Sequence, residues 1–160
     1  MLKPAILYKK EIEQNILNLA YSDEMFLFTG TLKYIIPDFE DNNGSLYQYA
    51  ILDKDKIIGY FTYYIDWYTS SVSNFGLISF EKGNSNIGIN IYREIKRIIN
   101  EYHMHRIEWR MVGNNPVEKH YDKFCQKYHG KKLVLTDVLK DRYGKYHNDV
   151  IYEIIFEQED

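Results

Sequence analysis

The segment from Lys82 to Gly88 contains residue types that can bind an anion. It reads Lys-Gly-Asn-Ser-Asn-Ile-Gly and stands between a β-favouring run and a strongly periodic helical segment. The N-terminus of a helix offers unpaired N–H donors and the positive end of the helix dipole, and glycine lets the backbone approach a ligand closely. The segment therefore fits a phosphate-binding turn. It fits equally an ordinary turn that Asn84, Ser85 or Asn86 caps.

Two other pairs of residues have reactive or metal-binding side chains. Cys125 and His129 are four residues apart and can face each other on a helix, but a thiol nucleophile needs a lowered pKa and a third group that orients the histidine. His103 and His105 stand at the end of a predicted helix, and the sequence shows no cysteine or carboxylate cluster that would complete a metal site with them. We therefore predict neither a cysteine nucleophile nor a metal site.

The composition is that of a globular domain. The chain has 160 residues, of which 45% are hydrophobic and 27% are charged, and this length predicts one domain over residues 1–160. Acidic residues outnumber basic residues by 23 to 20, which argues against nucleic acid as the main partner. Cys125 is the single cysteine, and no run reaches the roughly 18 apolar residues of a membrane span. The N-terminal apolar run is too short for a signal peptide, so we expect no membrane association and a cytoplasmic location.

The hydrophobic periodicity predicts a mixed sheet flanked by helices. Three β-favouring runs with short links predict antiparallel strands, and a helix between two strands predicts that strands 72–80 and 106–112 are parallel neighbours. The expected elements are a short strand in 2–8, a helix over 12–19, strands 47–52, 57–65 and 72–80, a helix over 87–102, a strand over 106–112, a helix opening at 115–118, and closing strands 132–139 and 149–156. The expected fold class is α/β, of the mixed α+β kind, with a mostly antiparallel twisted sheet.

This order of elements resembles the fold of the GCN5-related N-acetyltransferases (GNAT). The resemblance spans about residues 45–156 and, more loosely, the N-terminal third. In that superfamily a turn of the pattern Gln/Arg-x-x-Gly-x-Gly/Ala points backbone N–H groups at the pyrophosphate of acetyl-CoA. Gly88 then matches the last Gly/Ala, while Asn86 stands at the first Gly and Gly83 at the Gln/Arg. The resemblance implies acetyl-CoA as cosubstrate, held by Phe80, Gly83, Asn84, Ser85, Asn86, Ile87 and Gly88.

A second segment resembles the superfamily pattern Asn-x-x-Ala-x-x-Leu-Tyr-x-Lys. From Asn114 the chain reads Asn-Asn-Pro-Val-Glu-Lys-His-Tyr-Asp-Lys, with Val117 in place of Ala and His120 in place of Leu. The resemblance implies that Asn114 or Asn115 bonds the pantetheine arm, and that the phenol of Tyr121 protonates the departing thiolate. The alternative is that Asn115 only caps the helix and Tyr121 only packs.

The implied reaction also needs an oxyanion donor and a base. A backbone N–H from about residues 77–80 would polarise the thioester carbonyl. Glu81, at the end of strand 72–80, is the first candidate for the general base, followed by Asp66 and then Glu108. Each of these acids can instead be a solvated surface group, and water can relay the proton.

Two hypotheses from different classes follow. In the first, the protein is an N-acetyltransferase that moves an acetyl group from acetyl-CoA to a small-molecule or protein amine. In the second, it is a non-catalytic binding module with the same fold and a degenerate cofactor site. The sequence does not identify the acceptor, whose pocket we expect residues 21–45 and the loop from Asp66 to Asn74 to shape. The sequence also leaves open whether the protein forms a homodimer.

Overall fold

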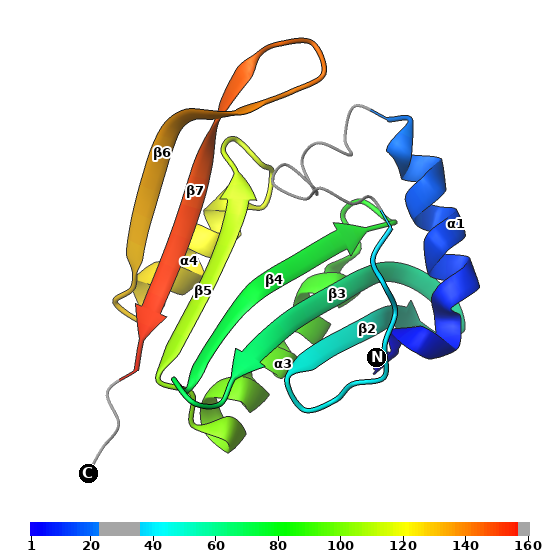
Figure 1. Ribbon diagram of the computed structural model, residues 1–160, viewed down its shortest axis with the longest axis horizontal. Coiled ribbons are helices and arrows are strands. Elements are labelled where there is room, and N and C mark those ends of the chain that lie inside the picture. Colours follow the sequence, from blue (N-terminus) through cyan, green and yellow to red (C-terminus); the bar gives the residue numbers. More distant parts are fainter. Residues whose placement is uncertain (23–35, 157–160) are drawn as a thin grey trace.

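Figure 1 shows the computed structural model, which describes residues 1–22 and 36–156. The elements are β1 (Leu2–Pro4), the 3-10 helix η1 (Ala5–Tyr8), α1 (Lys9–Ala20), β2 (Leu46–Asp53), β3 (Lys56–Asp66), β4 (Ser71–Ser79), α3 (Ser85–Tyr102), β5 (Arg106–Val112), α4 (Glu118–Lys127), β6 (Lys131–Lys140) and β7 (Tyr146–Ile155). The predicted order is confirmed, and the ends of the elements differ from the prediction by a few residues. The expected strand within residues 2–8 is divided between β1 and η1.

Seven strands form one sheet in the order β1-β2-β3-β4-β5-β7-β6. Neighbouring strands are antiparallel except β4 and β5, which are parallel as predicted. This parallel pairing consists of two residue pairs, Ser71 with Arg106 and Val72 with Ile107. Beyond these pairs the two strands diverge, so the sheet is split into a V (Figure 1).

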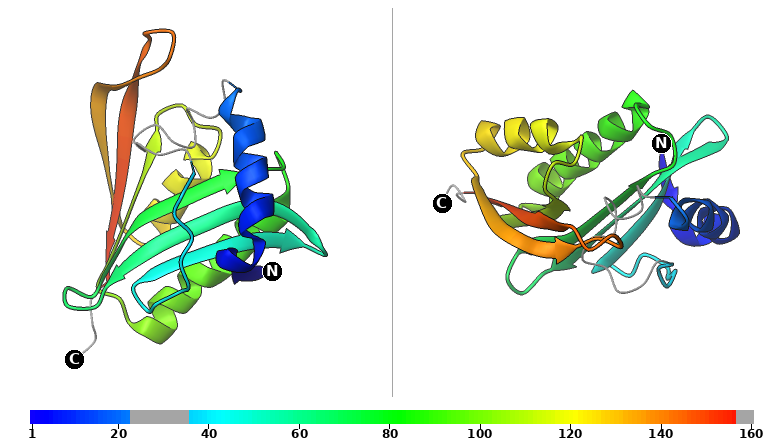
Figure 2. Two further views of the ribbon diagram at one scale, coloured as in Figure 1. Left: turned by 45° about the vertical axis from the view of Figure 1, so that its right-hand side comes forward. Right: turned by 90° about the horizontal axis from the view of Figure 1, so that it is seen from above.

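Helices cover both faces of the sheet. α3 and α4 lie on one face and α1 lies on the other (Figure 2). On the first face, Ile98 of α3 and Cys125 of α4 are buried in one core with Tyr152 of β7. On the second face, Ile12 and Ile16 of α1 are fully buried in a separate core. Burying one such isoleucine stabilises the fold by roughly 1.5–3 kcal/mol, so these cores fix how the helices lie against the divided sheet.

β4 carries a bulge near the point where it leaves β5. The register with β3 shifts between Thr62 and Tyr64, so Asn74 and Phe75 together oppose Tyr63. Asn74 has a φ of 54°, a left-handed conformation that asparagine adopts more readily than most residues. Because a bulge bends its strand and increases the local twist, it contributes to the separation of β4 from β5.

Candidate functional site

The divergence of β4 and β5 opens a cleft of about 720 Å³. α3 and α4 contribute the remaining walls, and the cleft is lined mainly by apolar side chains, among them Phe61, Leu77, Ile91, Trp109 and Tyr121. A mostly apolar cleft with a few polar groups is the usual form of a site for a cofactor or another small molecule.

One edge of β4 presents backbone polar groups to this cleft. Phe80 donates its N–H to the carbonyl of Ile58 over 2.9 Å, so these two residues form a hydrogen-bonded pair of the β3–β4 ladder. Such pairs alternate along an antiparallel ladder, so Leu77 and Ser79 turn their N–H and C=O groups away from β3. Since β5 pairs with β4 only as far as Val72, these groups face the gap and can bond an extended ligand as a further strand would.

The turn between β4 and α3 is capped by one of its own side chains. Asn84 is the N-cap of α3, and its Oδ1 accepts the N–H of Asn86 over 3.0 Å. Gly83 adopts the left-handed conformation with a φ of 71°, whereas Asn86 lies in the first turn of α3. Of the two interpretations of this segment, the structure has the capped turn. A phosphate group would therefore compete with Asn84 for the N–H of Asn86.

The predicted cofactor-binding residues fall in different places. Gly88 and Asn115 line the cleft. Phe80 packs against the core beneath α1 and Ile87 is buried beneath α3, and neither of them lines the cleft. The other predicted contacts lie outside the cleft lining: Gly83, Asn84, Ser85, Asn86 and Asn114.

α4 begins later than the sequence predicts. The Oδ1 of Asn115 accepts the N–H of Val117 over 3.2 Å, and the Oε2 of Glu118 accepts the N–H of Asn114 over 3.0 Å. The first helical residue is Glu118, the last residue of the predicted opening 115–118, so Asn115 caps a turn that precedes the helix. Asn114 takes a φ of 64°, which lets the chain turn from β5 toward α4.

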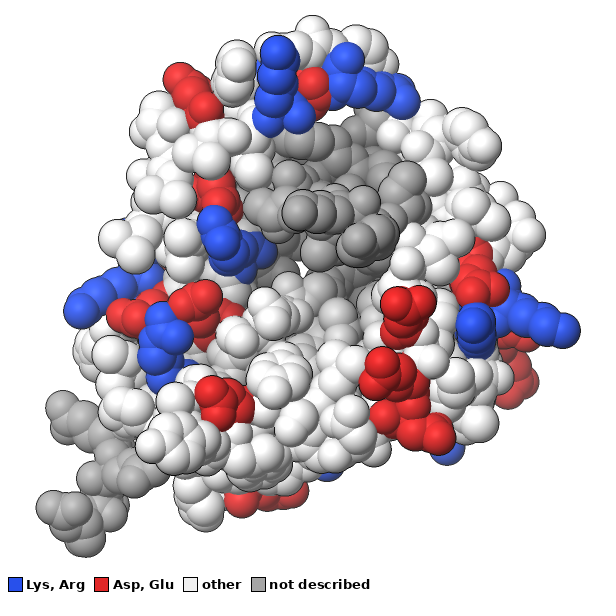
Figure 3. Space-filling view, in the orientation of Figure 1, with Lys and Arg blue, Asp and Glu red and all other residues white. Residues whose placement is uncertain are grey.

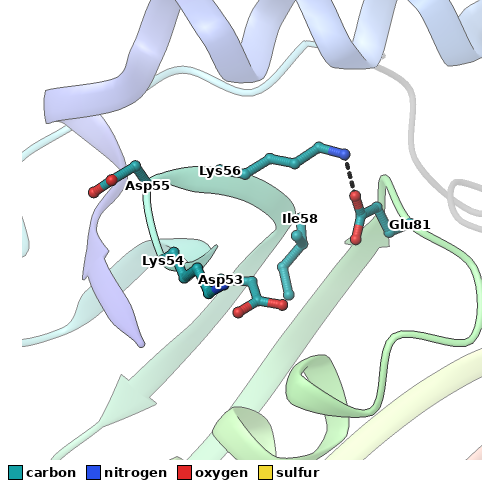
Figure 4. Close-up of a pocket in the computed structure, with 6 residues that line it drawn as sticks. All are labelled: Asp53, Lys54, Asp55, Lys56, Ile58 and Glu81. Atoms are coloured by element: carbon teal, nitrogen blue, oxygen red, sulfur yellow. Dashed lines mark hydrogen bonds and ion pairs between the residues drawn. The ribbon is translucent and has the colours of Figure 1, made fainter.

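Glu81, the first candidate for the base, points away from the cleft. It lines a separate pocket at the β2–β3 turn, with Asp53, Lys54, Asp55, Lys56 and Ile58 (Figure 4). Its carboxylate forms an ion pair with Lys56 and accepts a hydrogen bond from Asn84 over 2.8 Å. These two contacts, Lys56 first, lower the pKa of Glu81. Glu81 is therefore not among the residues that line the cleft, and a ligand bound there would not contact its carboxylate.

The other two candidate bases differ in position. Asp66 accepts the N–H groups of Thr69 and Tyr68, over 3.3 and 2.9 Å, and those contacts lower the pKa of its carboxyl. Asp66 thus stabilises the turn after β3, and it is not among the residues that line the cleft. Glu108 of β5 does line the cleft, and Arg106 beside it pairs with both Glu108 and Glu153.

Tyr121 lies in the cleft, as the resemblance implies. Its half-buried ring packs edge-on against Trp109 and Tyr152, with ring centroids 5.9 and 6.0 Å away. Within residues 1–22 and 36–156, its hydroxyl makes no hydrogen bond. Burial raises the pKa of this phenol to about 12, so at neutral pH it keeps its proton and can donate it.

An arginine–aspartate pair in the cleft was not singled out from the sequence. Asp149 of β7 is 1% exposed, and it forms an ion pair with Arg110 of β5. Both residues line the cleft. Both strands contain other charged residues, so no local pattern singles out Arg110 and Asp149, and the β5–β7 pairing is needed to bring them together. Asp149 is buried whereas Arg110 is 46% exposed, so loss of the arginine would leave a buried carboxylate without its charged partner.

The two other pairs of reactive residues show no active-site geometry. Cys125 is buried, and that burial raises the pKa of its thiol, which is the opposite of what a nucleophile needs. His103 ends α3 in the left-handed conformation, and the Nδ1 of His105 lies 3.1 Å from the carbonyl oxygen of Phe156. Within the described ranges, no group of three or more His, Cys, Asp or Glu side chains could hold a metal ion.

The expected acceptor region is described only in part. Residues 23–35 of the segment 21–45 lie outside the described residues, while Asn74, expected at the end of a loop from Asp66, lies within β4 and lines the cleft. Figure 3 shows the face of the molecule that is seen in Figure 1. Acidic and basic side chains are interspersed over its described part, and they leave no continuous basic surface. None of the described helices is long and apolar enough to cross a membrane.

The comparisons with known proteins find likeness in structure and not in sequence. No protein-family model and no curated sequence matches the chain. The ribosomal-protein alpha-N-acetyltransferase RimL, in complex with coenzyme A, has a TM-score of 0.71 at 13% identity, over 99% of this chain and 94% of that chain. Spermidine N-acetyltransferase from Vibrio cholerae, in complex with CoA and spermine, has a TM-score of 0.69 at 15% identity, over 97% of this chain and 94% of that chain.

A probable acetyltransferase (GNAT family) from Chromobacterium violaceum has a TM-score of 0.64 at 13% identity, over 97% of this chain and 85% of that chain. Two further acetyltransferase structures are matched over 62% and 59% of their own length. At such identities the likeness is one of fold, and it agrees with the divided sheet, the parallel β4–β5 pair and the two helices beside the cleft. The chain has the fold of the GNAT acetyltransferases.

Proposed function

We propose that this protein is an N-acetyltransferase that moves an acetyl group from acetyl-CoA to an amine. The observation that carries the proposal is the cleft between β4 and β5, whose lining combines the phenol of Tyr121 with the edge of β4; among residues 1–22 and 36–156 neither has a hydrogen-bond partner there. The likeness in fold to two acetyltransferases crystallised with coenzyme A supports it.

The lining of the cleft fits coenzyme A. The backbone groups of Leu77 and Ser79 suit the amide groups of a pantetheine arm, and Lys123 and Lys127 supply positive charge at the cleft for phosphate groups. The indole N–H of Trp109, which also lines the cleft, is buried and has no partner among the described residues. A buried donor without a partner calls for an explanation, and a ligand in the cleft is one.

Acetyl-CoA supplies the activated acetyl thioester, and the residues of the cleft supply proton transfer and orientation. Tyr121 holds a proton that it can donate to the departing sulfur, because its pKa of about 12 keeps the phenol neutral. Leu77 and Ser79 offer N–H groups that can stabilise a developing oxyanion. Glu108, the acid among the three sequence candidates that lines the cleft, accepts the proton of the attacking amine directly or through water.

We place the acceptor amine against the wall of the cleft that β5 and β7 form, because Glu108 lies there. Along β5 and β7, Arg106 and Arg110 pair with three carboxylates, those of Glu108, Asp149 and Glu153. Where β5 and β7 line the cleft, two acids, Glu108 and Asp149, stand against one arginine, Arg110, so this wall attracts an ammonium group before it is deprotonated. The neighbours in fold act on a protein and on spermidine, so both a protein amine and a small-molecule amine are open.

A panel assay tests the proposal. The protein is incubated with acetyl-CoA and a set of polyamines, amino acids and peptides with free N-termini, and thiol release and product mass are measured. We expect acetylation of at least one cationic amine, lost in Tyr121→Phe. If coenzyme A binds but none of these amines is acetylated, the proposal that the protein is an enzyme is wrong.

The capped turn favours the second candidate, a non-catalytic module of the same fold. Asn84 already occupies the N–H of Asn86, and Glu81 stands beside it. Both features weaken a phosphate site at the start of α3, since the cap removes a donor and the carboxylate repels an anion. Under this candidate the panel assay shows neither transfer nor dependence on Tyr121.

A further inference from the structure

One row of side chains crosses the face of the sheet that α4 covers. The pairing of β5, β7 and β6 sets Trp109 opposite Tyr152, and Tyr152 opposite Lys132. The rings of Trp109 and Tyr152 are stacked, with centroids 5.0 Å apart and an interplanar angle of 10°. The ammonium group of Lys132 lies 5.5 Å from the centroid of the Tyr152 ring. Tyr152 is fully buried, so the row places a stacked aromatic pair and a cation beneath α4.

A carboxylate of α4 binds this row from the helix side. The Oδ1 of Asp122 accepts the hydroxyl of Tyr152 over 2.7 Å and a hydrogen bond from the Nζ of Lys132 over 2.8 Å. These two contacts, Lys132 first, lower the pKa of Asp122, so the carboxylate is charged at neutral pH. Lys132 also pairs with Glu118, one turn earlier in α4, over 2.8 Å. Hydrogen bonds to charged groups are the strong ones, so this contact holds the end of the Tyr152 side chain at α4.

Tyr121, the residue before Asp122, packs against the same row. Its ring stands at 77° to both stacked rings, with its centroid 5.9 Å from that of Trp109 and 6.0 Å from that of Tyr152. Edge-to-face contacts between aromatic rings are directional. Among the residues that the structure describes, no hydrogen bond holds the Tyr121 hydroxyl. Ring packing therefore sets the direction of this phenol in the cleft, and a shift of Tyr152 would move it.

We propose that Tyr152 and Asp122 are positioning residues for Tyr121. The hydrogen bond between them holds the Tyr152 ring against Trp109, and these two rings direct the phenol of Tyr121 into the cleft. The effect on catalysis rests on the proposed function, in which this phenol donates a proton to the departing sulfur. A proton donor must lie within hydrogen-bonding reach of the atom that it protonates, and a misplacement of about 1 Å can slow a reaction about a hundredfold.

NMR signals of the Tyr121 ring test the positioning without any activity. In a chain with isotope-labelled tyrosine rings, these signals are identified by their loss in Tyr121→Phe. Tyr152→Phe keeps the stacked ring but removes the bond to Asp122, so we expect it to shift the Tyr121 signals. Asp122→Ala should shift them as well, whereas Asp122→Asn keeps an acceptor oxygen for the Tyr152 hydroxyl and should shift them less. Tyr121 signals that Tyr152→Phe and Asp122→Ala both leave unchanged overturn the proposal.

A buried tyrosine on the other face of the sheet is the matched control. Tyr60 is 3% exposed in the core beneath α1, and its hydroxyl accepts a hydrogen bond from Gln48 over 3.0 Å. Tyr60→Phe therefore also removes a buried hydrogen bond, but Tyr60 does not line the cleft. It should lower the free energy of unfolding, and leave kcat and the Tyr121 signals unchanged. If Tyr60→Phe shifts those signals as far as Tyr152→Phe does, a general loss of stability is the cause and the proposal is wrong.

A double-mutant cycle in the acetylation assay tests whether Tyr152 acts through the Tyr121 hydroxyl. Tyr152→Phe should lower kcat by about tenfold with the dissociation constant for acetyl-CoA unchanged, and by less than about twofold in the Tyr121→Phe background, where that hydroxyl is gone. No fall in the otherwise wild-type chain, or an equal fall in both backgrounds, overturns the proposal. If the wild type acetylates no amine, the proposed function is wrong, and the Tyr121 signals still decide whether Tyr152 and Asp122 position the phenol.

Discussion

Tyr121 and Glu108 reach the cleft from different elements, α4 and β5, and their proposed roles are complementary. The phenol is protonated at neutral pH and has no hydrogen-bond partner within the described ranges, so its O–H can bond a ligand in the cleft. Glu108 is held by Arg106 at the wall where the acceptor is expected. Proton transfer at the sulfur and at the amine can therefore be tested by separate substitutions.

Removing the hydroxyl of Tyr121 should affect turnover and not cofactor binding. For Tyr121→Phe we expect kcat to fall by about a hundredfold or more, with the dissociation constant for acetyl-CoA unchanged, because a general acid acts in the transition state. Steady-state kinetics and calorimetry measure the two quantities. Tyr128→Phe, a half-buried tyrosine on the same apolar stripe, is the control and should retain activity. Equal losses in both variants would assign Tyr121 a packing role.

Glu108 should be needed for deprotonation of the acceptor. Glu108→Gln keeps the shape of the side chain and removes the basic oxygen, so kcat/KM for the amine should fall by about a hundredfold and recover partly at high pH, where free amine is present. Glu153→Gln removes a carboxylate that also pairs with Arg106 but does not line the cleft, and it should have a small effect. If both variants lose activity equally, charge balance around Arg106 is the cause and Glu108 is not a base.

The sequence predicts some of these residues better than others, for physical reasons. Tyr121 was singled out because the segment from Asn114 resembles a superfamily pattern, and its side chain lines the cleft. The position of the Glu81 carboxylate could not be predicted, because its side chain points toward Lys56. These two residues lie in different turns, and no local sequence pattern predicts that they form an ion pair. Arg110 and Asp149 come together only through the β5–β7 register.

Among the elements, the first turns of α3 hold a glycine that packing does not require. A Cβ at Gly88 would meet no atom within 4 Å, and Gly88 lines the cleft. Gly88→Ala should therefore raise the free energy of unfolding by about 0.5–1 kcal/mol, through helix propensity alone. It should weaken acetyl-CoA binding if the ligand approaches this backbone.

Urea unfolding and calorimetry measure the two effects of Gly88→Ala. A control at the N-cap, Asn84→Ala, should instead lower stability by about 1 kcal/mol, because it removes the bond to the N–H of Asn86. A stabilised Gly88→Ala variant that binds acetyl-CoA as tightly as the wild type would show that the glycine serves no ligand.

The sequence predicts that a helix or strand is present better than it predicts the residues at which the element begins and ends. The spacing of Ile87, Ile91, Ile95 and Ile98 identified α3, since one apolar face repeats through the whole helix. The start of α4 was misjudged because Asn115 and Glu118 both bond backbone N–H groups, but of a turn that precedes the helix. Capping residues show that a helix is near, and tertiary contacts decide which residue begins it.

For the whole molecule, the buried tyrosines predict loss of stability at alkaline pH. Burial raises the pKa of Tyr47 and of Tyr121 to about 12, and it raises that of Tyr63 and Tyr152 as well. The unfolded phenols ionise near pH 10, so between about pH 10 and 12 the unfolded state binds fewer protons than the folded state. The stabilisation is present in full below pH 10 and falls as the pH rises through this window.

Urea unfolding at a series of pH values measures this loss. The free energy of unfolding should decline from about pH 10 upward, and Tyr121→Phe should decline less steeply because it lacks one of these groups. A free energy that stays level or rises between pH 10 and 12 would show that these tyrosines titrate as exposed phenols do.

The central claim is that the cleft between β4 and β5 binds acetyl-CoA, and calorimetric titration of the purified protein tests it most directly. We predict saturable one-to-one binding at micromolar concentrations, weakened when Leu77→Trp fills the cleft and unchanged in the distant variant Leu7→Lys. If no heat of binding is measured at millimolar acetyl-CoA, or if Leu77→Trp leaves binding intact, the claim that this cleft binds acetyl-CoA is contradicted.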